Sequence, residues 1–334
     1  MRLQRLTEYL LRHRWQAIIL TFIITYIPVI GMASILIACL VTLCVGVVEG
    51  AMFTLAATLP YVLVFASGTR EAIPMVVWAT VTLTVLGNVL TWVFAVMLRR
   101  HCSWSFILQV AALTGVLAIS VIHLAYPGIG DWWAAQLQSF YNQSAALAGA
   151  AQGETLPAIG ESQVDTINII KNFATGILAV FVLFTAVIQV MVARWWQITV
   201  SHTGRLGREL QGIHLSRLAG GLFMLALVLY YLENSVVLDI LPVLCLLFSA
   251  AGLSLVHYIF GLMEPSKGRF WLSLLYIALM YSLTMIAMLP LFSALNLILP
   301  VVIAVMILSA SIFAFVVLGL FDVWFNMRKR IRKV

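Results

Sequence analysis

Long apolar stretches without charged residues are the feature that most constrains this fold. Residues 72–98, for example, contain no charged side chain between Glu71 and Arg99. A helix of about 20 apolar residues is long enough to cross the hydrocarbon core of a bilayer. Only helices and closed barrels satisfy the backbone polar groups there, and these runs lack the alternation of barrel strands. The chain is therefore predicted to be an all-α, polytopic transmembrane bundle.

Composition supports this prediction. The chain has 334 residues, of which 63% are hydrophobic and 9% are charged, whereas a soluble domain is about 25% charged. We expect one integral membrane domain over residues 1–334, with the lipid bilayer as its main partner. About ten spans are predicted, at residues 16–30, 33–48, 51–66, 73–98, 104–126, 167–193, 217–233, 239–262, 270–289 and 300–324. The first three are short and contain Pro28 and Pro60, so eight crossings plus re-entrant segments is the alternative.

The distribution of basic residues predicts the orientation. If the N-terminus is cytoplasmic, all of the 19 Lys and Arg residues except Arg70 and Lys171 lie on the cytoplasmic side. Cytoplasmic loops of membrane proteins are enriched in Lys and Arg. Both termini are therefore predicted to be cytoplasmic.

Two connecting segments are long. The outer one, 127–166, is predicted to contain an amphipathic helix that begins near Asp131 and places Trp133, Leu137, Phe140 and Tyr141 on one face. Its second half is typical of a flexible connector. The inner one, 194–217, is basic and rich in glycine. A basic juxtamembrane loop either lies on anionic lipid or docks a membrane or cytosolic protein partner.

Three stretches together resemble a known family. They are "ARWWQ" (193–197), "VHYIFGLMEPSKGRFWLSLLYIALMY" (256–281) and "LGLFDVWFNMRKR" (318–330). In this order they resemble the YybS-like family of bacterial membrane proteins, whose function is unknown. The resemblance implies a location in the bacterial cytoplasmic (inner) membrane. That family is in turn remotely similar to the S subunits of energy-coupling-factor transporters, which implies solute binding near the outer face.

Motifs for common chemistries are missing from the sequence. It contains no GxxxxGK[ST] phosphate-binding loop, no HExxH and no GxSxG. The six histidines are scattered, and the four cysteines show no CxxC spacing. No basic block is suited to nucleic acid. The chain is therefore not expected to be an enzyme, and neither a metal site nor a cofactor is predicted.

Ionisable and amide side chains near the predicted outer boundary are the candidate site. Such groups are costly to bury in lipid and often mark a solute or ion pathway. They are His123, Lys171, Asn172, Glu233, Asn234 and Asp239. Lys171 is expected to pair with Glu233 or Asp239, so that the group lines an outward-opening pocket for a small solute. In the alternative, Lys171 extends to the membrane surface and the acids end their helices in water.

These observations predict a small-solute-binding or transport-associated subunit, which would need a partner as its energy source. The alternative is a non-catalytic scaffold or assembly protein that docks partners through its basic cytoplasmic loops.

Asp322 is unusual because it lies near the C-terminal end of the last span. Helix C-termini favour cations, so this acid is expected to form a structural ion pair. Asn326 offers only a hydrogen bond within the helix, and Arg328 is more distant. A cross-helix cation at the same depth is expected instead, for which the candidates are Arg99, Arg194 and Arg269.

Overall fold

Every regular element that the structure describes is an α-helix. The computed structural model describes residues 2–27, 31–67, 75–152, 161–201, 204, 206–232, 234–263, 265–287 and 298–331. Within these ranges no strand is present, so the predicted all-α class is confirmed for them. The chain forms two compact units, which are described separately below.

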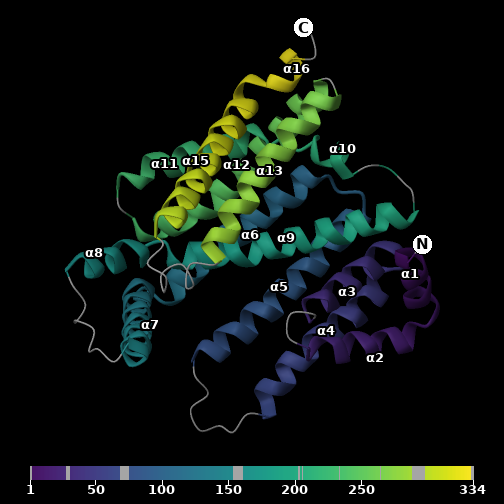
Figure 1. Cartoon of the computed structure of the whole chain (residues 1–334), viewed down its shortest axis with the longest axis horizontal. Helices are drawn as coiled ribbons and strands as arrows, with labels where there is room; N and C mark the ends of the chain where they lie inside the picture. The colour runs from purple at the N-terminus through teal and green to yellow at the C-terminus, as the bar shows by residue number, and fades with distance from the viewer. Residues whose placement is uncertain are drawn as a thin grey trace. The chain divides into compact units, whose positions relative to one another are not determined.

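Unit 1 comprises residues 1–108 and 181–213, and unit 2 comprises residues 109–180 and 214–334. Figure 1 labels the helices along the chain. Residues of two long helices, α6 (Trp104–Ala125) and α9 (Ala174–Ser201), are divided between the two units. The other helices of unit 1 are α1 (Arg2–Arg12), α2 (Arg14–Thr25), α3 (Met32–Cys44), α4 (Val47–Ser67), α5 (Met75–Arg99) and α10 (Leu206–Leu210). Those of unit 2 are α7 (Ile129–Gln152), α8 (Glu161–Ile170), α11 (Arg217–Tyr230), α12 (Ser235–Leu262), α13 (Pro265–Ala287), α15 (Ile298–Phe325) and α16 (Met327–Ile331).

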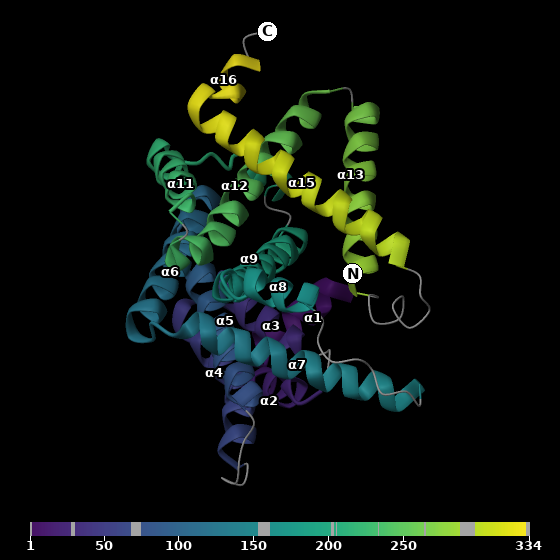
Figure 2. The same cartoon turned by 90° about the vertical axis from the view of Figure 1, so that its left-hand side faces the viewer.

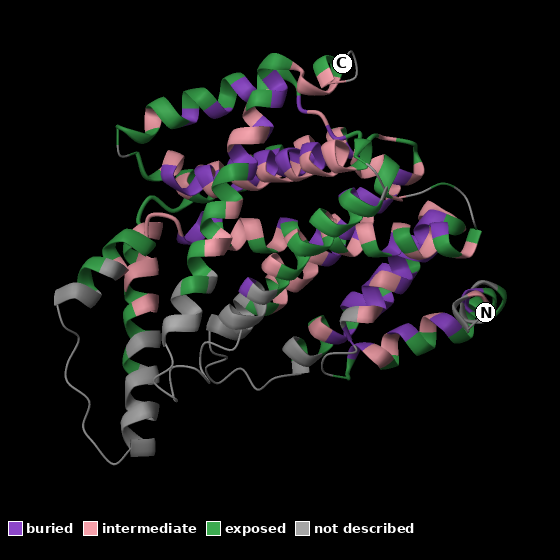
Figure 3. Cartoon of the chain, turned by 45° about the horizontal axis from the view of Figure 1, so that its top comes forward, coloured by how far each residue is buried: buried purple, intermediate pink, exposed green. Residues whose placement is uncertain are grey.

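Five helices among the described residues are long and apolar enough to cross a membrane. They lie at Thr80–Arg99, Trp104–Ala125, Ala174–Ser201, Ser235–Leu262 and Val305–Phe325. Buried and exposed positions alternate along most helices (Figure 3), and many of the exposed side chains are large and apolar. Helices with apolar outer faces are compatible with a membrane protein. The apolar stretches Arg14–Thr25, Ala33–Cys44, Val47–Leu63 and Arg217–Tyr230 are shorter, so the count of ten spans stays a prediction.

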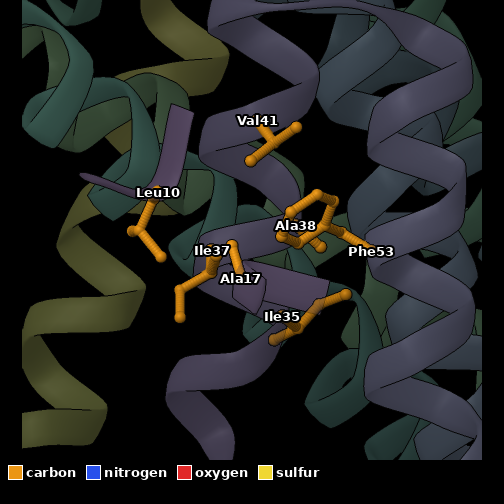
Figure 4. Close-up of a cluster of buried hydrophobic side chains, with 7 residues drawn as sticks. All are labelled: Leu10, Ala17, Ile35, Ile37, Ala38, Val41 and Phe53. Atoms are coloured by element: carbon orange, nitrogen blue, oxygen red, sulfur yellow. The ribbon is translucent and has the colours of Figure 1, made fainter. Parts of the chain in front are cut away.

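The core of unit 1 is built on the first four helices. Seven buried apolar side chains from α1 to α4 converge there (Figure 4). They are Leu10, Ala17, Ile35, Ile37, Ala38, Val41 and Phe53. Arg99, at the end of α5, bonds the C-terminal end of α3. It donates hydrogen bonds to the carbonyls of Thr42 (3.0 Å), Leu43 (3.0 Å) and Val45 (2.8 Å). The last carbonyls of a helix have no partner within the helix, and a cation is favourable at a helix C-terminus.

Glycines allow close helix packing in unit 2. Helices α12 and α15 make the most extensive contact in the described chain and cross each other (Figure 2). A Cβ on Gly252 would lie 1.8 Å from the carbonyl oxygen of Phe315, and one on Gly319 would lie 2.3 Å from that of Phe248. In lipid, helix association depends on such close packing because the hydrophobic effect does not distinguish a helix from the acyl chains.

Asp322 lies one turn beyond this contact, and its partner is Arg328. Helix α15 ends at Phe325, and Asn326 takes a left-handed conformation (φ 48°) before α16 begins. The chain therefore folds back, and Nε of Arg328 lies 3.0 Å from Oδ2 of Asp322. The Arg328 guanidinium also donates to Oγ of Ser254 on α12 (3.0 Å). Burial lowers the pKa of Arg328, although the negative charge of Asp322 opposes this effect.

The sequence-based expectation of a cross-helix arginine for Asp322 is thus corrected. On a straight helix, a residue six positions away points to a different face, which is why Arg328 was the less favoured candidate. The left-handed Asn326 removes that restriction. The tie to a second helix runs instead from Arg328 to Ser254.

The Gly252 contact gives the first prediction. Gly252→Ala should destabilise the protein by about 1–3 kcal/mol, because the new methyl group forces α12 away from α15. A Cβ on Gly221, in α11, would have no neighbouring group within 4 Å. Gly221→Ala is therefore the matched control and should be neutral or stabilise by up to about 1 kcal/mol through helix propensity. Thermal unfolding in one detergent measures both, and equal effects would contradict the close contact.

The ion pair gives the second prediction. Asp322→Asn should cost about 3 kcal/mol, because it leaves the half-buried Arg328 without its counter-charge. Adding Arg328→Met should recover part of that loss, and thermal unfolding of the single and double variants measures the coupling. An Asp322→Asn protein with unchanged expression and melting temperature would show that the pair has no structural role.

Candidate functional site

The predicted span 167–193 is interrupted in the structure. Helix α8 ends at Ile170 and α9 begins at Ala174, so Lys171, Asn172 and Phe173 form a turn between them. The amides of Asn172 and Phe173 bond three residues back, to Ile169 (3.3 Å) and Ile170 (3.0 Å). Bonds of this kind tighten and end an α-helix. The prediction of one continuous helix here is wrong, and the break exposes the first amides of α9.

Asp239 of α12 satisfies one of those amides. Its Oδ1 accepts a hydrogen bond from the backbone N–H of Gly176 at 2.8 Å. A cap residue normally supplies such a carboxylate from just before the helix; here it comes from another helix. Gly176 is required at this position, because a Cβ would lie 1.9 Å from the carbonyl oxygen of Asp239.

His123, near the end of α6, bonds the other carboxylate oxygen. Its Nε2 lies 2.8 Å from Oδ2 of Asp239, and the two side chains are only 8% and 2% exposed. The carboxylate also faces the N-terminal end of α9, where the helix dipole favours negative charge. Three helices of unit 2 therefore meet at one buried carboxylate. Ionisable residues inside membrane segments are often functional.

Lys171 has a different partner from the one expected. Its Nζ lies 3.9 Å from Oδ1 of Asp131 on α7, and the partners of Asp239 are His123 and Gly176. The expected Lys171–Asp239 pair is therefore corrected. Asp131 is 91% exposed, so this pair is a weak, solvated one. Glu233 lies outside the described residues.

Asn234 also has a local structural role. It is the N-cap of α12, where its Oδ1 accepts from the amide of Val236 at 3.0 Å. The cap fixes the start of α12, which places Asp239 in the second turn and directs it into unit 2. The predicted amphipathic helix is present as α7, and its Trp133 donates through Nε1 to Oγ1 of Thr175 at 2.9 Å. Helix α7 is thereby tied to the beginning of α9.

A cavity of about 780 Å³ lies at the α8–α9 break. Its lining combines polar and aromatic side chains from α8, the turn, α11 and α12. They are Asp165, Asn168, Ile169, Asn172, Phe173, Tyr230, Tyr231 and Leu238. Leu238 is the sequence neighbour of Asp239, so the cavity and the buried pair are adjacent along α12.

Several residues of this region were not identified as site residues from sequence. Gly176 and Thr175 carry no recognisable signal. Asp165 reads as an ordinary loop acid, and Tyr230 and Tyr231 read equally well as part of an interfacial aromatic belt. Asp131 is an N-terminal helix acid. Among the six predicted site residues, the structure joins His123 and Asp239 and places Asn172 in the cavity wall.

A second polar cluster lies in unit 1, on the basic 194–217 segment. Glu209 bonds Arg194 through Oε1 to Nη2 (2.5 Å) and through Oε2 to Nε (3.2 Å), and it accepts from Trp104 Nε1 at 3.1 Å. Burial alone would raise the pKa of Glu209. The hydrogen bonds from Arg194 and Trp104, with the charge of Arg194, outweigh burial and hold the pKa below its ordinary value. The cluster orders this loop within the unit.

Metal coordination finds no support in the residues whose placement is described, since none of them form a group of three or more His, Cys, Asp or Glu side chains suited to a metal ion.

Comparisons with known proteins return no match of any kind: no family model, no curated protein and no solved structure is similar to this chain.

The role of Asp239 gives the third prediction. Asp239→Leu should destabilise the protein by about 2–5 kcal/mol, because it removes the acceptor for both His123 and the Gly176 amide. Asp239→Asn keeps an acceptor oxygen and should lose less than half as much. Thermal unfolding measures both variants. Equal losses would mean that the retained acceptor oxygen contributes nothing, which would contradict the hydrogen-bonding role of the side chain.

The lowered pKa of Glu209 gives a pH prediction. A carboxyl group whose pKa falls on folding adds stability at pH values above its unfolded pKa, and that stability is lost as the pH falls through the folded pKa. Glu209→Gln should therefore be about 1–3 kcal/mol less stable than the natural protein at pH 7, and the gap should shrink below about pH 4.5.

Glu49→Gln is the control, because it removes a more exposed carboxylate paired with Arg14 at 3.4 Å. Its gap at pH 7 should be under about 1 kcal/mol. A Glu209→Gln gap that stays constant from pH 7 to pH 3.5 would contradict the electrostatic role of Glu209.

Proposed function

We propose that this chain is a polytopic protein of the bacterial cytoplasmic membrane that binds a small polar solute in the cavity at the α8–α9 break. The observation that carries the proposal is the break itself, with amide and carboxylate side chains around a cavity of about 780 Å³. Small-molecule sites are commonly 300–1,000 Å³ and contain a few convergent polar groups. Transporters likewise bind solutes at interrupted helices, where backbone groups are freed from the helix.

The buried His123–Asp239 pair supports the same location. Desolvating a carboxylate is costly unless its hydrogen bonds are complete. The carboxylate of Asp239 bonds His123 on α6 and accepts from the Gly176 amide on α9, each at 2.8 Å. A rigid, satisfied polar group beside the cavity keeps the start of α9 in place, and preorganised sites bind more tightly because less freedom is lost. His123 and Asp239 therefore act in this proposal as positioning residues.

The wider arrangement in this proposal follows the predicted topology. About ten spans with both termini in the cytoplasm would put the α8–α9 break near the outer face. The sequence contains no phosphate-binding loop, so transport would require a partner that supplies energy. The resemblance to the YybS-like family, and through it to S subunits of energy-coupling-factor transporters, agrees with this role and remains a prediction.

The test is ligand-dependent stabilisation of the full chain in mild detergent. A panel of small neutral, anionic and cationic metabolites is screened by thermal unfolding, since a ligand at a hundred times its Kd adds about 2.7 kcal/mol. At least one member should stabilise the protein. Asn172→Leu, in the cavity wall, should reduce that stabilisation. Asn142→Leu, at an exposed position of α7, should leave it unchanged.

Two results would contradict the proposal. One is a folded protein that no member of the panel stabilises. The other is equal loss of binding in both asparagine variants. If the first result came with a stoichiometric co-purifying protein, it would favour the scaffold alternative, in which the basic cytoplasmic loops dock partners.

A further inference from the structure

The end of α11 carries two aromatic faces at right angles. The rings of Tyr230 and Tyr231 have centroids 5.9 Å apart and planes 80° apart. Both line the cavity at the α8–α9 break, together with the ring of Phe173. Their faces are available, since Tyr230 is 45% and Tyr231 is 85% exposed. Perpendicular aromatic walls of this kind are how proteins recognise ammonium groups, through attraction between the cation and the negative ring faces.

The charge around these rings is negative. Asp165 is the one charged side chain among the described residues that line the cavity. Lys171, which is next in sequence to the lining residue Asn172, is paired with Asp131. The other polar groups in the lining, Asn168 and Asn172, are neutral amides whose oxygens can accept hydrogen bonds. A cation entering the cavity therefore meets the carboxylate of Asp165 in the lining, whereas Lys171 is not among the lining residues.

The local backbone contributes partial charges of both signs, because α9 begins at the same break and a helix N-terminus favours negative charge. Tyr230 is the last residue of α11, and Tyr231 is its C-cap. The unpaired carbonyls at a helix C-terminus carry a partial negative charge, which favours a nearby cation. The opposing N-terminus of α12 is partly neutralised, because Asn234 accepts from the amide of Val236.

We propose that the cavity binds a small organic cation, specifically an alkylammonium group seated against Tyr230 and Tyr231 with Asp165 as its counter-charge. This inference rests on the proposed solute-binding function and assigns its ligand class. The cavity volume of about 780 Å³ leaves room for a polar substituent on the ammonium, which the amides of Asn168 and Asn172 are positioned to bind. An aromatic belt at the membrane surface, the competing explanation for the tyrosines, predicts no dependence on ligand charge.

The experiment compares a cation with its neutral isostere. Choline and 3,3-dimethylbutan-1-ol have the same shape, but a quaternary nitrogen in the first is a carbon atom in the second. Thermal unfolding of the full chain in detergent is followed against the concentration of each compound at constant ionic strength. Choline should raise the melting temperature in a saturable way, and the alcohol should have no effect at the same concentrations.

Variants locate the effect. Tyr231→Leu and Asp165→Asn should each weaken the choline midpoint by about two- to fivefold, which is a typical loss for one exposed cation–aromatic or charge contact. Tyr126→Leu is the matched control, because Tyr126 is an exposed tyrosine just beyond α6 and is not among the cavity-lining residues. Its choline midpoint should not change.

Each other result overturns the inference in a distinguishable way. Equal stabilisation by choline and the alcohol would mean that shape, not charge, is recognised. Equal weakening in the Tyr231 and Tyr126 variants would assign the tyrosines to the aromatic belt. Stabilisation by neutral or anionic members of the metabolite panel, without any by choline, would reject the cation site and leave the proposed function standing. A folded protein that none of these compounds stabilises would reject both.

Discussion

The buried carboxylate of Asp239 is the interaction on which the candidate site depends. A carboxylate buried among helices is costly unless its hydrogen bonds are made within the protein. Asp239 takes one from His123 on α6 and one from the Gly176 amide at the start of α9. The second bond is available only because the chain turns at residues 171–173 and leaves the first amides of α9 free. The break and the buried acid therefore stabilise each other.

The same requirement operates elsewhere in the chain. Asp322 forms an ion pair with Arg328, and Arg99 donates hydrogen bonds to the carbonyls at the end of α3. Glycine sets the distances, because Gly252 and Gly319 bring α12 and α15 together just as Gly176 brings α9 to α12. Apolar residues fill the remaining space and cover the outer faces. Polar contacts, more than apolar burial, therefore specify which helices meet and where, as expected when the surroundings are as apolar as the core.

Periodicity and charge predicted some of these features and could not predict others. The apolar runs located the helices, because run length and lack of charge are properties of each segment alone. Those runs also predicted that His123 and Asp239 lie near one end of their helices, and the structure bonds the two side chains to each other. The pairing of Lys171 with Asp131 was not predicted, since the two residues lie on different elements and are distant in the sequence. Gly176 gave no signal because its role is a contact made by another helix. Arg328 pairs with Asp322 because the single left-handed residue Asn326 turns the chain back. On a straight helix the spacing of the two residues would not allow this pair.

The central claim is that Asp239 holds the start of α9 at the cavity, and amide hydrogen exchange of Gly176 tests it most directly. Exchange reports the opening of individual hydrogen bonds. In the natural protein the Gly176 amide should exchange slowly, at a rate comparable to amides in the middle of α9. In Asp239→Leu it should exchange much faster, while amides near Val190 keep their protection. Fast exchange at Gly176 in the natural protein, or no difference between the two proteins, would contradict the account.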